Sequence, residues 1–263
     1  MQVIDVHVHL NYYTNLNQDQ DIPSLQSRLE FLLASMRTNN IEYSLILTSY
    51  IINSTRPSTS DIIKIVDKNK MSNHVGIVAS YTISNNDFKD IKKYKTWIKN
   101  GLVKGIKIYS GYEYYYPNDK RYQPIYDLCT EYQIPVMIHT GDTYSSKGKL
   151  KYSHPLNVDE LAVDNPDLNI VICHLGNPWL LDCQEVIYKN KNVYADISGL
   201  IVGDFNNYNQ RVYRIRIKEM LEYIGTPHRL LFGSDWPISN MNSYLNFVEN
   251  LKLNKESIEF LLV

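Results

Sequence analysis

Four histidines and one aspartate have the residue types, and the positions along the chain, expected of a metal centre. Each lies at or near the end of a short apolar segment rich in β-branched residues: His7, His9, His139, His174 and Asp235. Imidazole nitrogens and a carboxylate, without thiolates, suit Zn²⁺ first, and also Mn²⁺, Fe²⁺ or Co²⁺. An all-oxygen site for Mg²⁺ or Ca²⁺ does not match this set. The sequence therefore predicts a site for a divalent metal, most simply Zn²⁺.

The spacing of His7 and His9 indicates that the two rings point the same way. Alternate side chains of a β-strand lie on one face, so these imidazoles converge while Val6, Val8 and Leu10 face the opposite side. A His-x-His pair is a weak signal by itself. It gains weight here because the other candidate ligands also stand at strand ends.

Such residues need a scaffold that brings distant segments together. Apolar, β-branched segments alternate with helical stretches along the chain, which is typical of parallel βαβ units. The eight expected strands are VIDVHVH from Val3, SLILTSY from Ser44, VGIVASY from Val75, VKGIKIY from Val103, PVMIHTG from Pro135, NIVICHLG from Asn169, VYADISG from Val193 and RLLFGSDWP from Arg229. Helices are expected from Ser24 and near Thr59, Asp87, Pro124, Asn157, Leu180, Arg211 and Ser243. This order predicts one (β/α)8 barrel domain over 1–263, with the candidate ligands around one mouth.

Composition and charge narrow the class of partner. The 263 residues are 44% hydrophobic and 21% charged, with a formal net charge of -1, as in an ordinary globular protein. No basic stripe for nucleic acid and no span of transmembrane length is present, and the N-terminus does not read as a signal peptide. Cys129, Cys173 and Cys183 have no metal-site or disulfide spacing, and we expect them to be reduced. We therefore expect a cytoplasmic protein with a small-molecule substrate; its oligomeric state stays open, a homo-oligomer included.

Five segments together resemble a known family. They are DVHVH around His7 and His9, VKGIKIY at Lys107, IPVMIHTG at His139, IVICHLG at His174 and LLFGSDWP at Asp235. In this order they are similar to the amidohydrolase superfamily, most closely its amidohydrolase-related branch of one-domain TIM-barrel metal-dependent hydrolases. The resemblance covers nearly the whole chain and implies a (β/α)8 barrel and an enzyme.

The resemblance also implies roles for individual residues. His7, His9, His139 and Asp235 match the metal ligands, and His174 matches a histidine that is either catalytic or a ligand of a second metal. A divalent cation lowers the pKa of a bound water, and Asp235 can both contact the metal and accept a proton from that water. His174 would then polarise the substrate carbonyl or protonate the leaving group. Asp5 also alternates inward, one layer below the histidines, and we expect it to support the ligands rather than to bind metal.

Lys107 has two interpretations. Ile106 and Ile108 face outward, so the Lys107 amine is expected inside the barrel, where a charge needs compensation. In binuclear relatives such a lysine is carboxylated and bridges two metals, with His174 as a ligand of the second. Alternatively, an unmodified Lys107 pairs with Asp235, Asp196 or a substrate carboxylate.

Substrate contacts are expected from three loops at the same mouth. These are GYEYYYPND, DTYSSKGKLKYSHP and LIVGDFNNYNQ, after the fourth, fifth and seventh strands. Tyr109, Tyr112 and Trp236 are the aromatic candidates for substrate binding, with packing as the alternative for each. Lys107 is a fourth candidate.

Three functions follow from this pattern. The first is hydrolysis of an amide, lactone or related ester bond of a small molecule by metal-activated water. The second is non-oxidative decarboxylation, because the same branch includes metal-dependent decarboxylases. A non-catalytic barrel that keeps its metal for stability is the third, and the complete set of candidate ligands argues against it.

Overall fold

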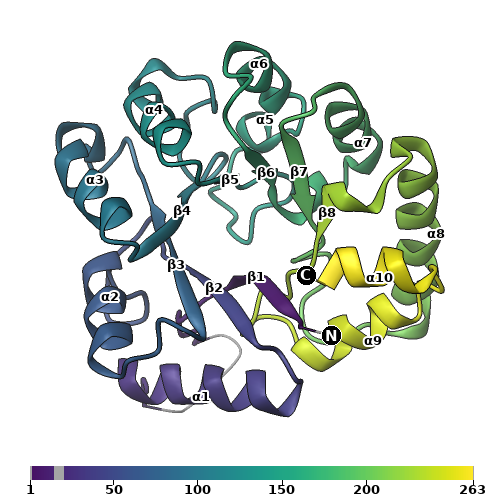
Figure 1. The fold of residues 1–263 in the computed structure, drawn as a ribbon, viewed down its shortest axis with the longest axis horizontal. Coiled ribbons are helices and arrows are strands. Elements are labelled where there is room, and N and C mark those ends of the chain that lie inside the picture. The colour runs from purple at the N-terminus through teal and green to yellow at the C-terminus, as the bar shows by residue number, and fades with distance from the viewer. Residues whose placement is uncertain (1, 15–20, 263) are drawn as a thin grey trace.

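A ring of strands surrounded by helices forms the computed structural model of this chain (Figure 1), which describes residues 2–14 and 21–262. The strands form one eight-stranded parallel sheet in the order in which they occur along the chain. They are β1 (Ile4–Val8), β2 (Tyr43–Leu47), β3 (Val75–Ser80), β4 (Val103–Ile108), β5 (Val136–Ile138), β6 (Ile170–Ile172), β7 (Val193–Asp196) and β8 (Leu230–Leu231). The predicted (β/α)8 barrel is confirmed.

Backbone hydrogen bonds between the β1 region and the segment after β8 complete the ring. The His9 backbone N–H donates to the Trp236 carbonyl at 2.7 Å, and the Asp235 N–H donates to the His7 carbonyl at 2.8 Å. Three of these four residues are candidate ligands, and the fourth, Trp236, directly follows Asp235. The backbone contacts that close the barrel therefore also bring these candidate ligands together.

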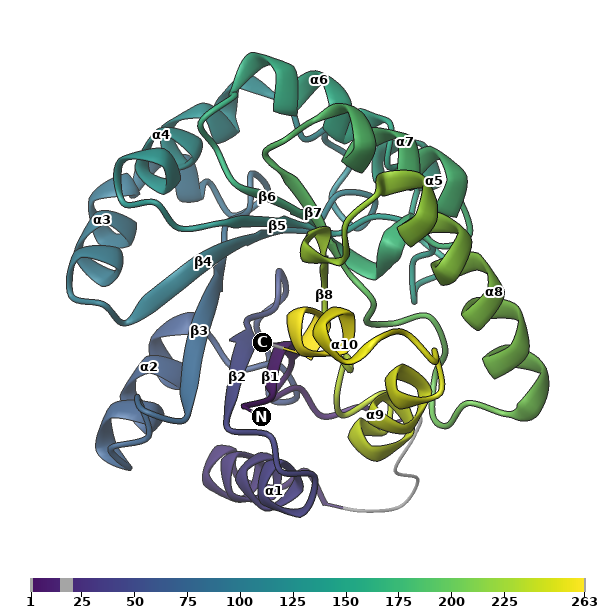
Figure 2. The same cartoon turned by 45° about the vertical axis from the view of Figure 1, so that its right-hand side comes forward.

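Helices cover the outside of the strands. Their bounds are α1 (Leu25–Thr38), α2 (Thr59–Lys68), α3 (Ile91–Lys99), α4 (Gln123–Glu131), α5 (Leu150–Ser153), α6 (Asn157–Asp164), α7 (Leu180–Lys189), α8 (Asn207–Ile224), α9 (Met241–Glu249) and α10 (Lys255–Leu262). Side chains of Ser24, Ser58, Asn206 and Asn240 accept hydrogen bonds from backbone N–H groups in the first turns of α1, α2, α8 and α9. In both views α10 lies beside β8, and the two chain ends lie close together (Figures 1 and 2). Within the described residues, every helix is too short or too polar to cross a membrane.

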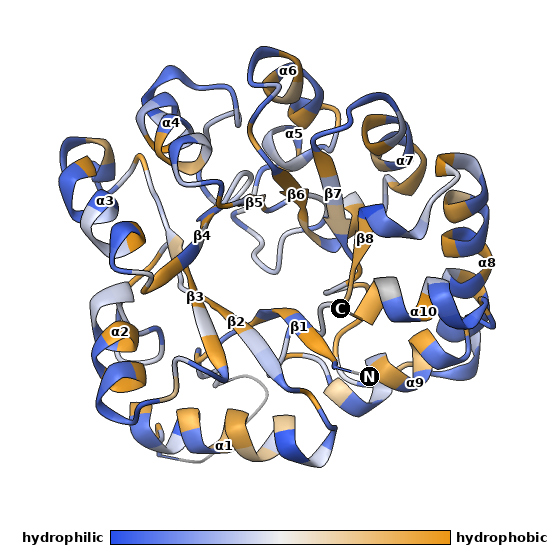
Figure 3. Ribbon diagram, viewed as in Figure 1, coloured by the Kyte–Doolittle hydropathy of each residue, from blue (hydrophilic) through white to orange (hydrophobic). Residues whose placement is uncertain are grey.

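The core has two layers because side chains alternate along the strands. Residues such as Ile106, Ile138 and Ile172 pack between strands and helices, where Figure 3 shows apolar strands inside a ring of amphipathic helices. The alternate positions form a smaller inner cluster of Leu47, Val78, Met137, Val171 and Cys173.

One prediction about the first strand was wrong. Val8 and Leu10 pack in the outer layer as expected, but Val6 contacts the inner cluster. The reason is a register shift between β1 and β2, which lies between Asp5 and Val8 and breaks the strict alternation there.

All eight strands are shorter than the segments predicted from sequence, and after two of them, β6 and β8, the chain turns at a left-handed residue. β6 ends at Ile172, and the next residues form the 3-10 turn η3 (Cys173–Gly176), in which His174 has a φ of 63°. After β8 the chain turns at Asp235, whose φ is 61°. The left-handed conformation is uncommon for residues other than glycine and ends an extended strand. It places both side chains at the strand ends, where the cavity lies.

Candidate metal centre

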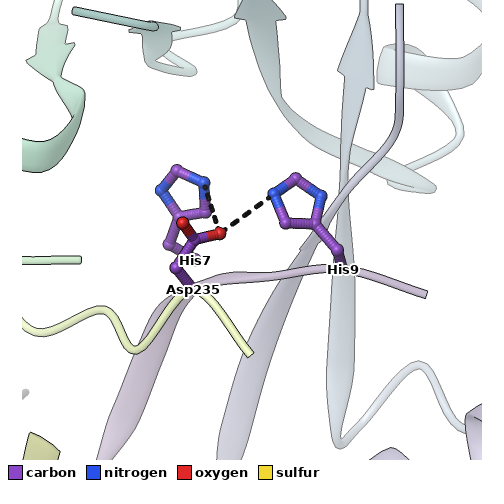
Figure 4. Close-up of side chains that lie close together, drawn as sticks. All are labelled: His7, His9 and Asp235. Carbon is purple, nitrogen blue, oxygen red and sulfur yellow. Dashed lines mark ion pairs between the residues drawn. The ribbon is translucent and has the colours of Figure 1, made fainter. Parts of the chain in front are cut away.

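His7 and His9 bring the same ring atom to one carboxylate. His9 Nε2 lies 3.3 Å from Asp235 Oδ1, and His7 Nε2 lies 3.8 Å from it, as Figure 4 shows. All three side chains are buried. One ligand atom from each lies within 4.8 Å of the other two, which is the arrangement needed around a single ion.

Hydrogen bonds on the far side of each ring determine which nitrogen faces Asp235. His7 Nδ1 lies 2.9 Å from Asp196 Oδ2, and His9 Nδ1 lies 2.8 Å from the carbonyl oxygen of Leu47. Carbonyl and carboxylate oxygens only accept hydrogen bonds, so each Nδ1 carries the proton and each Nε2 presents a lone pair. Such acceptors behind the ring are the usual means of orienting a metal-binding histidine.

This donor set fits a divalent metal. Burial lowers the pKa of His7 to about 4, so at neutral pH its Nε2 carries no proton. Burial alone would raise the pKa of Asp235, but the nearby imidazoles of His9, His7 and His174 hold it well below its usual value. Two lone pairs and an ionised carboxylate oxygen then face one another, and a cation between them converts repulsion into attraction.

His174 faces the same cavity from η3, the turn that follows β6. Its ring centroid lies 4.9 Å from that of His7, and its Nδ1 lies 2.9 Å from Ser198 Oγ. Burial is the main cause of its lowered pKa. With His7 and Asp196, His174 forms a second group of ligand atoms within 4.8 Å. Hydrogen bonds explain why these three residues lie close together without an ion. Asp196 accepts one from the His7 ring and one from the His174 backbone N–H.

His139 lines the cavity without joining either group of ligand atoms. Its ring centroid is 5.0 Å from that of His174, and its Nε2 lies 3.0 Å from the Asp142 carbonyl oxygen. Since that oxygen only accepts, Nε2 carries the proton and Nδ1 is the atom free of one. Burial, followed by the charges of His174 and Lys107, lowers the pKa of His139 well below its usual value.

Lys107 is inside the barrel as predicted, but its partner differs from those considered. Its side chain is 1% exposed, and Nζ donates to Cys173 Sγ at 2.7 Å. Nζ also lies 5.5 Å from the centroid of the Tyr109 ring. Among the described residues, the predicted ion pairs with Asp235 or Asp196 are not formed. The amine thus has no carboxylate to neutralise it and lines the cavity.

The cavity above these residues has a volume of about 390 Å³, large enough for a small molecule. All three predicted loops contribute to its lining, and so do the loops after β1 and β2. Tyr109 and Tyr112 line it, together with Tyr13, Tyr50 and Tyr144. The structure does not bring Trp236 there: it is buried outside the lining, 5.4 Å from the Phe31 ring of α1.

Asp5 supports the site through the backbone. Its carboxylate accepts from the His7 N–H at 3.0 Å and from the N–H and hydroxyl of Ser234 at 3.1 and 2.6 Å. Asp5 therefore ties β1 to the segment that carries Asp235, and it touches no ring of the candidate ligands.

Sequence reasoning missed three residues of the site. Asp196 and Ser198 bond to the histidines, although Asp196 was considered only as a partner for Lys107. The signal that revealed the others, a polar residue at a strand end, was present for both. Arg56 lines the cavity from the loop after β2, beyond the end of the expected strand at Tyr50, where strand alternation no longer indicates the direction of a side chain.

The chain matches one protein family in sequence and several solved structures in fold. A family model described as Amidohydrolase matches residues 74–257. None of the curated proteins matches the chain. Similar solved structures include an uncharacterised TIM-barrel protein from Bordetella bronchiseptica, with a TM-score of 0.74 and 20% identity over 100% of this chain and 95% of that one.

Two further structures carry printed activities. A probable 2-pyrone-4,6-dicarboxylic acid hydrolase from Acinetobacter baumannii has a TM-score of 0.67 and 14% identity, over 100% of this chain and 96% of that one. A dihydroxybenzoic acid decarboxylase from a Polaromonas species, with bound manganese, also has a TM-score of 0.67 and 14% identity, over 99% and 94%. At these identities the likeness establishes the fold.

Proposed function

Because the chain belongs to the amidohydrolase family, a family of metal-dependent enzymes, we propose that it is a hydrolase that cleaves an amide, lactone or related ester bond of a small molecule with metal-activated water. The observation that carries the proposal is the meeting of His7 Nε2 and His9 Nε2 at Asp235 Oδ1. We propose Zn²⁺ as the ion, held by His7, His9, His139 and Asp235, because these donors are three imidazoles and one carboxylate. The manganese in the decarboxylase of similar fold supports Mn²⁺ as the alternative.

Asp235 has the position of a general base. When bound, the divalent ion would supply Lewis acidity, lowering the pKa of water and polarising a substrate carbonyl. The carboxylate of Asp235 is ionised at neutral pH and has a second oxygen, Oδ2, besides the one that faces His7 and His9. That oxygen is free of the histidine contacts and can accept a proton from the attacking water.

The charges around the cavity favour an anionic substrate. Arg56 lies beside the Tyr13 ring, with 5.4 Å from Cζ to the ring centroid, and donates to Ser49 Oγ at 3.2 Å. Within the described residues, no carboxylate lies within ion-pair distance of Arg56 or Lys107. Their two positive charges balance Asp142 and Asp235, so a bound divalent ion makes the lining positive.

The tyrosines add a preference for flat rings. The Tyr50 ring contacts those of Tyr109 and Tyr112, with centroid separations of 5.0 and 5.2 Å, and all three line the cavity. Aromatic side chains that line a pocket can stack on planar rings of a ligand, and guanidinium groups form bidentate hydrogen bonds with carboxylates. We therefore propose a ring-containing substrate with an acidic group, such as a carboxylated lactone.

The same cations favour one second candidate, non-oxidative decarboxylation. Lys107 and Arg56, which have no carboxylate partner among the described residues, could hold the carboxylate that such a reaction removes, and a dihydroxybenzoic acid decarboxylase is among the proteins of similar fold. The hydrolase remains the first proposal because Asp235 provides a base for water next to the metal ligands.

One experiment separates the two. Purified Zn²⁺-loaded and Mn²⁺-loaded protein would be incubated with arrays of lactones, N-acyl amides and aromatic carboxylic acids in water enriched in ¹⁸O. Hydrolysis transfers ¹⁸O to the product and releases no CO₂. Release of CO₂ without ¹⁸O at the cleaved bond would instead establish the decarboxylase.

A further inference from the structure

The hydroxyl of Ser198 lies at the centre of a buried group of three side chains. Ser198 Oγ is 2.9 Å from His174 Nδ1 and 3.0 Å from His7 Nδ1, and it donates to Asp196 Oδ1. Ser198 and Asp196 are both fully buried. One hydroxyl therefore joins two candidate site histidines to one carboxylate.

Counting protons assigns the tautomer of His174. A serine hydroxyl has one proton and two lone pairs. The nearest acceptor is Asp196 Oδ1, to which the Ser198 hydroxyl donates, while Asp196 Oδ2 faces His7 Nδ1. The proton of Ser198 is committed there, so the hydroxyl can only accept from His174. His174 must then carry its proton on Nδ1.

The backbone around His174 makes this contact rigid. The His174 N–H donates to Asp196 Oδ1 at 2.9 Å, so the same carboxylate holds the histidine through its main chain. Gly199 has a φ of 59°, and a Cβ there would lie 2.4 Å from His174 Nδ1. The ring is thus packed directly against backbone beside Ser198.

From this geometry we infer that Ser198 is a positioning residue that holds His174 with Nδ1 protonated and Nε2 presenting a lone pair to the cavity. The inference rests on the proposed function and sharpens it. A lone pair at Nε2 accepts a hydrogen bond or binds a cation. In the resting enzyme His174 therefore receives a proton or a metal, and it donates to a leaving group only after it has taken up a proton.

The opposite arrangement of His139 makes the assignment specific. The Asp142 carbonyl holds the His139 proton on Nε2, leaving Nδ1 unprotonated, whereas Ser198 holds the His174 proton on Nδ1. Two neighbouring rings, 5.0 Å apart, thus present different nitrogens. A general property of buried histidines would not produce this difference.

Nitrogen NMR of the ring tests the inference without a substrate. Zn²⁺-loaded protein with ¹⁵N-labelled histidine side chains gives ¹H–¹⁵N correlations that distinguish the tautomers, and the His174 signals are assigned by their loss in His174→Gln. The wild type should show a single form of His174, protonated on Nδ1. Protonation of Nε2 in the wild type would overturn the inference, whatever any variant does.

Three serine variants test the role of the hydroxyl. Ser198→Ala should give a mixture of tautomers at His174 while Zn²⁺ is retained, because His7 Nδ1 keeps its direct bond to Asp196. Ser198→Thr, which keeps the hydroxyl, should restore the single form. Ser44→Ala is the control, since Ser44 Oγ is equally buried and has no hydrogen-bond partner in the described chain.

The outcomes separate this inference from the proposed function. If His174 kept its tautomer in a folded Ser198→Ala variant, the backbone and not the hydroxyl would determine that tautomer. This result would overturn the inference and leave the hydrolase proposal intact. Failure to find hydrolysis would leave the NMR result standing.

Discussion

At the scale of single residues, the site is defined by which atom each side chain presents. His7 and His9 have their Nδ1 atoms occupied by Asp196 and by the Leu47 carbonyl, so only Nε2 is available to a cation. Asp235 adds an ionised oxygen at the point where both Nε2 atoms meet. Replacing any one of these groups should therefore affect metal and chemistry to different extents.

Asp235→Asn should abolish turnover and cost only part of the metal affinity. The amide keeps one oxygen that can bind the ion, but it cannot accept a proton, and losing a general base costs about 10²- to 10⁴-fold in rate. His7→Ala should instead lower metal occupancy itself. Elemental analysis and kcat of both variants check this, and near-normal turnover in Asp235→Asn would refute the role of Asp235.

Arg56→Met should weaken the binding of anions and spare neutral ligands. A hydrogen bond to a charged group contributes about 1.5–3 kcal/mol, so the Kd of benzoate for Zn²⁺-loaded protein should rise by roughly 10- to 100-fold, with little change for benzamide. Calorimetry measures both. Arg121→Met is the matched control, because Arg121 pairs with Asp119 outside the cavity lining. Equal effects of the two substitutions would argue against an anion site at Arg56.

At the scale of elements, the junction between β1 and the segment after β8 depends on a buried acid. Asp5 accepts hydrogen bonds from the backbones of both segments, and burial raises its pKa to about 7. A carboxyl group that keeps its proton in the folded state makes stability depend on pH.

The free energy of unfolding should fall as pH rises from about 4 to about 7, through the protonation of Asp5. An unfolded aspartate titrates near pH 3.9, so between these values the folded protein holds a proton that the unfolded chain has lost. Three pKa units correspond to about 4 kcal/mol, and the contribution levels off above pH 7.

Asp5→Asn isolates this contribution, because the amide does not titrate in this range. Urea unfolding of both proteins across pH, with a chelator present so that metal loss plays no part, gives the difference. As pH rises, the free energy of unfolding of Asp5→Asn should increase relative to that of the wild type. Parallel curves for the two proteins would show that Asp5 is ionised in the fold.

At the scale of the whole molecule, the ligands come from both ends of the chain. His7 and His9 lie near the N-terminus and Asp235 lies over two hundred residues later, so a bound ion would link the strands that close the barrel. Metal binding should then stabilise the fold as well as support catalysis.

Removal of metal with a chelator should lower the melting temperature and abolish turnover together. An ion present at 100 times its Kd contributes about 2.7 kcal/mol, which in a chain of this size corresponds to a shift of roughly 5–10 °C. Differential scanning calorimetry and activity before chelation, after chelation and after return of Zn²⁺ check this. A loss of stability in a protein that turns over no compound would favour the non-catalytic metal barrel.

The barrel and the clustering of the candidate ligands could be predicted from sequence because they follow from local patterns. β-branched segments alternate with helical ones, and a polar residue at the end of a parallel strand must lie at the mouth where all strands end. His7, His9, His139, His174 and Asp235 were identified on that basis. The family match agrees with the five segments that carried the resemblance.

What the tertiary structure decided is which atoms meet. The partner of Lys107 is the Cys173 thiol and not a carboxylate, and Trp236 packs on α1 outside the cavity. Ser198 holds two histidines, although its position after a strand end does not show which side chains it contacts. Strand periodicity fixes the face on which a side chain lies, but hydrogen-bond partners depend on register shifts, left-handed turns and loop paths that only the closed barrel brings together.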